Sequence, residues 1–72
     1  MWSKEIFSQR VSLLRQKVGL SQKELGELTG LSRQAVSDIE RGERLTSIEG
    51  LNALADYFDV STDYLLGRSD EQ

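Results

Sequence analysis

Two helix signals and a turn signal lie within residues 21–42, SQKELGELTGLSRQAVSDIERG. Ser21 and Glu24 have the spacing of a capping box, in which the serine hydroxyl accepts from the third backbone N–H of a helix and the glutamate reaches back. Apolar residues follow at helical spacing, and Gly30 tolerates the positive φ that ends many helices. We therefore predict a helix over residues 22–29.

A second helix is predicted over residues 33–41, with Ser32 as its cap. Val36 and Ile39 lie three residues apart and face inward, and Gly42 follows the last turn. Gly26 lies on the packing side of the first helix, where the lack of a side chain lets a second helix cross closely. Two short helices, a turn with glycine and a small residue at the crossing are the elements of a helix-turn-helix.

This pattern resembles the helix-turn-helix of Cro and the lambda-type phage repressors, also called xenobiotic-response-element type regulators. The matching residues are Gln22, Leu25, Gly26 (where the family prefers Ala or Gly), Gly30, Leu31, Ser32, Val36, Ile39, Glu40 and Gly42. The flanking segments GLSQ, IERG and DVSTDYLLG also match, so that the resemblance covers roughly residues 6–67. It implies an all-α, five-helix, lambda-repressor-like DNA-binding domain with the helix-turn-helix in its second and third helices.

The rest of the chain has apolar residues at helical spacing and lacks proline, which favours one all-helical domain with a core over about residues 6–67. We predict further helices over Met1–Val18, capped by Ser3, from a capping box of Thr46 and Glu49 to Phe58, and over Thr62–Leu66, capped by Ser61. The tail, residues 68–72, is expected to fray. The inward side chains are predicted to be Ile6, Phe7, Val11, Leu13, Leu14, Val18, Leu25, Leu28, Ile48, Leu51, Leu54, Ala55 and Phe58.

Composition excludes several classes of function. The 72 residues contain no Cys and no His, which excludes disulfides, the usual zinc sites and the usual nucleophile–base pairs of enzymes. We predict no enzyme, no cofactor and no metal, and interpret Asp56, Asp59 and Asp63 as a solvated acidic face. No long apolar run or signal peptide is visible, so we expect a soluble cytoplasmic protein, associated with the nucleoid and not with a membrane.

The formal net charge of −3 is unusual for a nucleic-acid-binding protein, but the charge is segregated. Residues 1–44 carry eight basic and six acidic side chains, giving +2, and residues 45–72 carry one basic and six acidic, giving −5. Because exposed charges beyond about 8–10 Å are largely screened, the local charge matters more than the total. We therefore expect few phosphate contacts and modest non-specific affinity for DNA.

The resemblance implies a buried ion pair between Arg15 and Glu40, which joins the first helix to the recognition helix. Arg15 lies next to the apolar stripe of its helix and needs a partner there. Two solvated surface charges are the alternative.

The outward side of residues 32–41 is predicted to contact base edges in the major groove. Arg33 can donate twice to guanine, and Gln34 can pair twice with adenine. Ser37 can reach a base or a phosphate, and Asp38 can accept from cytosine or orient a neighbouring arginine. The resemblance implies base reading at the same positions. The base-reading candidates are Ser32, Arg33, Gln34, Ser37 and Asp38.

Phosphate contacts are expected at the start of residues 22–29, where free backbone N–H groups favour an anion. The resemblance implies that Gln22 clamps a phosphate. The phosphate-binding candidates are Ser21, Gln22, Lys23, Arg10, Arg41 and Arg44. Glu43 departs from the family, which often has a basic residue there, and lowers the expected affinity.

We interpret the chain as a transcription regulator that binds a palindromic double-stranded DNA operator as a homodimer. It is expected to repress by blocking RNA polymerase, and activation by contact with the polymerase is the alternative. The predicted dimer interface is Leu45, Val60, Tyr64, Leu65 and Leu66. RNA polymerase or a regulatory protein are further candidate partners, and Trp2 either packs over a helix end or contacts a partner. Many members of the family carry a second domain after a Leu-Leu-Gly end such as residues 65–67. The alternative is a protein-interaction module of the same fold, an antitoxin or an inhibitor-binding regulator, which the acidic composition favours.

Overall fold

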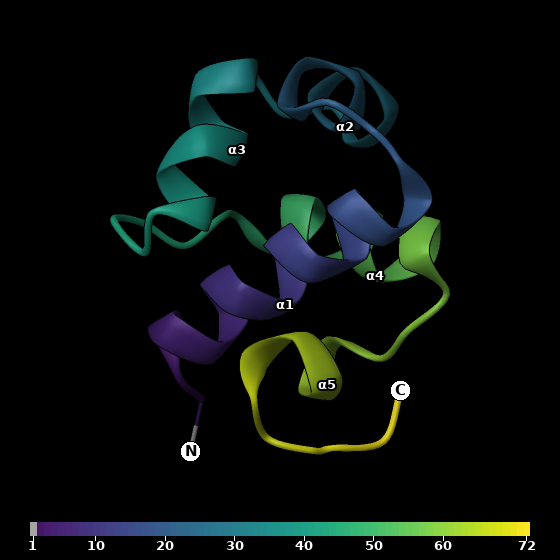
Figure 1. Cartoon of the computed structure of the whole chain (residues 1–72). Coiled ribbons are helices and arrows are strands. Elements are labelled where there is room, and N and C mark those ends of the chain that lie inside the picture. The colour runs from purple at the N-terminus through teal and green to yellow at the C-terminus, as the bar shows by residue number, and fades with distance from the viewer. Residues whose placement is uncertain (1) are drawn as a thin grey trace.

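A computed structural model describes residues 2–72, which form five helices and no strand. The helices are α1 (Lys4–Val18), α2 (Gln22–Thr29), α3 (Arg33–Glu40), α4 (Ile48–Phe58) and α5 (Thr62–Leu66). Figure 1 shows α1 across the middle of the molecule, with α2 and α3 on one side and α5 on the other. The all-α prediction is confirmed. The bounds of α2 and α5 are as predicted, α3 ends one residue early, and Met1, which was predicted to begin the first helix, lies outside the described residues.

A serine caps the N-terminus of every described helix. The hydroxyls of Ser3, Ser21, Ser32, Ser47 and Ser61 each accept from a backbone N–H in the first turn. Such a cap contributes about 1 kcal/mol, which matters in a chain too short to bury a large core. The predicted capping box of Thr46 and Glu49 is wrong, because Ser47 caps α4. Thr46 instead packs at Gly50, where an added Cβ would lie 2.1 Å from its Oγ1.

The core lies where α1, α2, α3, α4 and α5 converge. Its buried members are Phe7, Val11, Leu14, Leu25, Val36, Ile39, Leu54, Ala55 and Leu65. Four residues predicted to face inward are exposed: Leu13, Val18, Leu28 and Ile48. Leu28 is exposed because α2 packs through Leu25, Gly26 and Thr29, and Ile48 because it is the first residue of α4. Leu13 lies on a different side of α1 from the strip that carries Phe7, Val11 and Leu14, and Val18 continues that strip but is the last residue of the helix.

The C-terminal tail folds back onto the domain, and the prediction that it frays is wrong. The Arg10 guanidinium donates to the carbonyl oxygens of Tyr64 and Ser69 and to Asp70. The same guanidinium lies 4.1 Å from the centre of the Tyr64 ring. The backbone N–H of Ser61 donates to the Gln72 carbonyl at 2.9 Å. The tail is visible in yellow, curving below α5 (Figure 1).

Gly26 sets the close approach of α2 to the turn before α3. A Cβ at this position would lie 2.5 Å from the Leu31 carbonyl oxygen and 3.3 Å from backbone atoms of Ser32. The neighbours are backbone atoms and cannot rotate away. The resembling family prefers alanine or glycine at the matching position, and glycine is the residue that fits in this chain.

Gly26→Ala is therefore expected to lower the free energy of unfolding by about 1–3 kcal/mol, the usual cost of overpacking. Helix propensity alone predicts a change of about 1 kcal/mol in the opposite direction, so the sign of the effect is diagnostic. Urea unfolding followed by circular dichroism measures it, with Glu27→Ala on the exposed side of α2 as the control. A Gly26→Ala variant that is more stable than the parent would contradict the close approach.

Candidate nucleic-acid interface

Helices α2 and α3 pack against each other across the turn at residues 30–32. Gly30 ends α2 in the left-handed conformation, with φ at 75°, and the backbone N–H of Leu31 donates to the Gly26 carbonyl at 2.9 Å. Ala35, Val36 and Ile39 form the buried face of α3. The opposite face of α3 is open to solvent, so that this helix is held from behind and its outward side chains are available to a partner.

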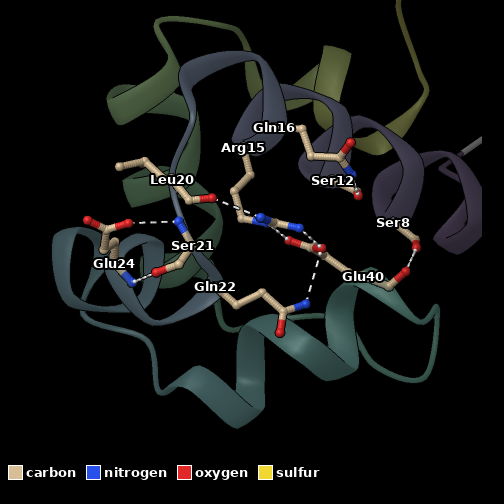
Figure 2. Close-up of polar contacts among 9 residues, drawn as sticks. All are labelled: Ser8, Ser12, Arg15, Gln16, Leu20, Ser21, Gln22, Glu24 and Glu40. Atoms are coloured by element: carbon tan, nitrogen blue, oxygen red, sulfur yellow. Dashed lines mark hydrogen bonds and ion pairs between the residues drawn. The ribbon is translucent and has the colours of Figure 1, made fainter.

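An ion pair between Arg15 and Glu40 joins α1 to the end of α3, as the resemblance implies (Figure 2). Arg15 Nε and Nη2 donate to the two carboxylate oxygens at 2.6 and 2.9 Å, and Nη1 donates to the Leu20 carbonyl at 2.8 Å. The side chains of Arg15 and Glu40 are only 16% and 7% exposed. The hydrogen bond to Glu40 raises the pKa of Arg15, although burial alone would lower it. A bidentate ion pair of this kind fixes the relative orientation of the two side chains as well as the distance between them.

Glu40 also holds two further groups in place. Gln22 Nε2, at the start of α2, donates to Glu40 Oε1 at 3.3 Å, and the Ser8 hydroxyl donates to the Glu40 carbonyl oxygen at 2.5 Å (Figure 2). The ends of three helices therefore meet at one carboxylate and its backbone. Sequence spacing does not indicate the contact between Ser8 and Glu40, because the two residues lie 32 positions apart.

The five base-reading candidates lie together at the exposed side of α3. Ser32, Arg33 and Gln34 are exposed, and Ser37 and Asp38 are half-buried. The Ser32 hydroxyl already accepts from the N–H of Ala35 as the helix cap. Arg33 and Gln34 therefore present the long polar side chains at the first turn of the helix.

A group that we name the Asp38 cluster consists of Gln34, Asp38, Arg41 and Arg44. Asp38 Oδ1 accepts from Gln34 Nε2 at 2.9 Å and from Arg41 Nη2 at 2.5 Å. Arg44 Nη1 lies 3.6 Å from Asp38 Oδ2. The spacings of four and three residues bring Gln34 and Arg41 to the same side of the helix as Asp38. Sequence reasoning anticipated that Asp38 can orient a neighbouring arginine, and it missed that the same carboxylate also accepts from Gln34.

The start of α2 carries the candidates Ser21, Gln22 and Lys23. The first N–H groups of a helix have no partner within it and attract anions. The Glu24 carboxylate lies at this end of α2 and accepts from the Ser21 N–H at 2.9 Å. This hydrogen bond lowers the pKa of Glu24. The carboxylate therefore competes with an incoming phosphate. Lys23 is exposed, while the Gln22 amide nitrogen is engaged with Glu40.

Two predicted site residues are placed elsewhere by the structure. The Arg10 guanidinium holds the tail and its side chain is 17% exposed, so the phosphate contact of Arg10 stays a prediction that would require these contacts to open. Leu65 is wrong as an interface residue, because it is fully buried in the core. Contacts more than 50 residues away decide the position of Arg10, and no local pattern indicates them.

The other interface candidates, Leu45, Val60, Tyr64 and Leu66, are half-buried and pack against the core. Leu45 and Leu66 line a shallow, mainly apolar hollow of about 180 Å³, together with Trp2, Phe7, Thr46 and Leu51. Trp2 is 48% exposed at this hollow.

Residues 2–72 contain no group of three or more acidic side chains placed to hold a metal ion, Asp56, Asp59 and Asp63 included. Among the helices described, none is long and apolar enough to cross a membrane.

Comparison with known proteins agrees with this geometry. A family model described as helix-turn-helix matches residues 11–65. The HTH-type transcriptional regulators ImmR and AnsR of Bacillus subtilis are 38% identical over 61 residues and 36% identical over 63 residues. These alignments cover 85% and 88% of this chain but 48% and 54% of the relatives. The chain thus spans about half the length of these regulators.

A solved structure of the P22 c2 repressor in complex with a synthetic operator is also similar. It superimposes with a TM-score of 0.83 at 35% identity, over 88% of this chain and 96% of that one. The repressor comes from Salmonella phage P22. At 88% of this chain, the likeness is not confined to the two helices of the motif.

Proposed function

The chain belongs to the helix-turn-helix family, and from this premise we propose that it is a sequence-specific regulator of transcription that binds double-stranded DNA through α3. The observation that carries the proposal is the exposed first turn of α3, with Arg33 and Gln34 directed outward from a helix anchored on its other side. A recognition helix held in this way places its N-terminal residues at base edges in the major groove. We further propose that the regulator represses, as the name of the P22 relative indicates for that protein.

The proposed division of labour follows the chemistry of the side chains. Arg33 contacts guanine O6 and N7 with two hydrogen bonds, and Gln34 contacts adenine N6 and N7. Ser32 and Ser37 make shorter contacts to a base or a phosphate. Phosphates on either side of the groove are bound by Ser21, Gln22, Lys23, Arg41 and Arg44, which lie at the start of α2 and around the end of α3.

We propose that two copies act together on a near-palindrome. One recognition helix covers a few base pairs, and dimers of this kind contact half-sites about 34 Å apart. The half-buried residues Leu45, Val60, Tyr64 and Leu66 form the proposed isologous patch. Sedimentation equilibrium with and without duplex tests it. A monomer mass that stays constant up to high protein concentration with DNA present would contradict the dimer.

Selection from a pool of random duplexes, read out by sequencing, tests the function itself. Enrichment of a two-fold symmetric site is expected. Absence of enrichment, together with no binding to random duplex at low salt and micromolar protein, would favour the alternative of a protein-interaction module. The carboxylates of Asp38, Glu43 and Glu24 around the reading face are the observations that support that alternative.

Arg41→Ala is expected to weaken binding to every sequence and to reduce the slope of log affinity against log salt by about one. Arg41 uses its guanidinium for Ser37, Asp38 and Glu43, but a guanidinium has five N–H donors, which leaves donors for a phosphate. Fluorescence anisotropy at several salt concentrations measures the slope, with Arg68→Ala in the tail as the matched control. An unchanged slope would remove Arg41 from the set of phosphate contacts.

A further inference from the structure

Asp38 is an acidic side chain on the outward face of α3, where a bound duplex brings phosphates. An unpaired carboxylate in that place would repel DNA. The Asp38 side chain is nevertheless only 18% exposed, because Gln34, Arg41 and Arg44 cover it. Its Oδ1 therefore already accepts two hydrogen bonds from this chain, and its Oδ2 forms an ion pair with Arg44, in the absence of a partner.

The contact between Asp38 and Gln34 determines which atoms of the glutamine amide remain free. One hydrogen of Gln34 Nε2 is donated to Asp38 Oδ1 at 2.9 Å. The second Nε2 hydrogen and Oε1 are left, and these are the donor and the acceptor that a paired contact with adenine requires. A glutamine side chain that is free to rotate loses conformational entropy when it is fixed on a base. Asp38 meets part of that cost before DNA arrives.

The charges of the same region cancel. Arg41 contacts Asp38 and Glu43, and Arg44 lies beside Asp38, so that two positive and two negative groups surround the end of α3. Attraction to phosphates provides most of the sequence-independent affinity of DNA-binding proteins. A locally neutral end of the recognition helix therefore weakens binding to arbitrary DNA. The base contacts of Arg33 and Gln34 then provide a larger share of the affinity for a specific site.

On the basis of the proposed function, we propose that Asp38 is a positioning residue that sets sequence specificity without contacting a base. It acts in two ways: its oxygen orients the Gln34 amide, and its charge suppresses binding to arbitrary DNA.

Two variants separate these roles. Asp38→Ala removes both the acceptor and the charge, whereas Asp38→Asn keeps an oxygen acceptor for Gln34 and removes only the charge. Each protein, with the parent and Gln34→Ala, is subjected to selection from random duplexes. Affinity for a non-enriched duplex of the same length is measured by anisotropy. The base position that changes in Gln34→Ala identifies where Gln34 contacts the site.

For Asp38→Ala, discrimination at the Gln34 position is expected to fall from about tenfold or more to about twofold. Affinity for the non-enriched duplex should rise roughly fivefold at low salt, and less at high salt. Asp38→Asn should give the same rise but keep the preference at the Gln34 position. Unchanged preference at that position in Asp38→Ala would overturn the inference, as would loss of preference at a different position, which marks Asp38 as a base contact. A parent protein that enriches no sequence would instead contradict the proposed function.

Discussion

Arg15→Ala is expected to lower the free energy of unfolding by about 3–5 kcal/mol, the cost of leaving one member of a buried ion pair without its partner. The substitution removes both hydrogen bonds to Glu40 and the one to the Leu20 carbonyl. The Glu40 side chain, only 7% exposed, would keep Gln22 Nε2 as its one remaining side-chain donor among the described residues. A domain of this size has a total stability of roughly 5 kcal/mol, so the variant should be largely unfolded at moderate temperature.

Lys17→Ala is the matched control, since it removes the same charge from an exposed position of α1. Its effect is expected to stay within about 0.5 kcal/mol. Replacing both partners, as Arg15→Met with Glu40→Leu, should recover most of the loss, because apolar residues of similar volume often replace buried ion pairs at little cost. Thermal and urea unfolding measure all three proteins. An Arg15→Ala variant as stable as Lys17→Ala would show that the pair contributes no more than a surface contact.

Local signals predicted the helix-turn-helix almost completely. Ser21, Gly30 and Ser32 each act within four residues of their own position, through a cap or a left-handed turn. The bounds of α2 therefore follow from sequence alone. The one misplaced cap, Thr46 in place of Ser47, arises where two hydroxyl residues are adjacent and tertiary packing at Gly50 chooses between them.

Predictions that depend on distant segments were less reliable. Arg10 has the chemistry of a phosphate contact, and only the return of residues 69–70 to α1 shows that it is used within the fold. Leu65 belongs to an apolar group in the sequence, and only the packing of α5 on α1 decides that Leu65 is buried while Leu66 is half-buried. The pair of Arg15 and Glu40 was anticipated through resemblance, because nothing in the spacing of 25 residues indicates a contact.

The distribution of charge can be predicted in part from the sequence and is completed by the structure. The sequence places the acidic excess in residues 45–72, which favours an N-terminal surface for DNA. The structure adds that the arginines near the end of α3 are partly neutralised by Asp38 and Glu43. A protein with this arrangement depends on base contacts more than on general attraction, and it should show a large ratio of specific to non-specific affinity at modest absolute affinity.

Replacing Arg33, Gln34 and Ser37 together with alanine tests most directly whether DNA affinity depends on the base contacts of α3. Two paired base contacts contribute about 1–3 kcal/mol of discrimination each, so affinity for the selected operator should fall at least about thirtyfold. Affinity for random duplex should fall much less, because Lys23, Arg41 and Arg44 are retained. The three replaced side chains lie outside the buried face of α3, which is formed by Ala35, Val36 and Ile39. Stability should therefore change by less than about 1 kcal/mol.

A triple replacement of Gln9, Lys17 and Asn52 is the matched control, since it also removes one positive charge and exposed polar side chains, but from α1 and α4. Anisotropy with the selected operator and with random duplex is measured for both triple variants. The ratio of the two affinities should collapse for the α3 variant and stay unchanged for the control. If the α3 variant keeps that ratio, the reading face lies elsewhere on the molecule, and the assignment of α3 is wrong even if the protein binds DNA.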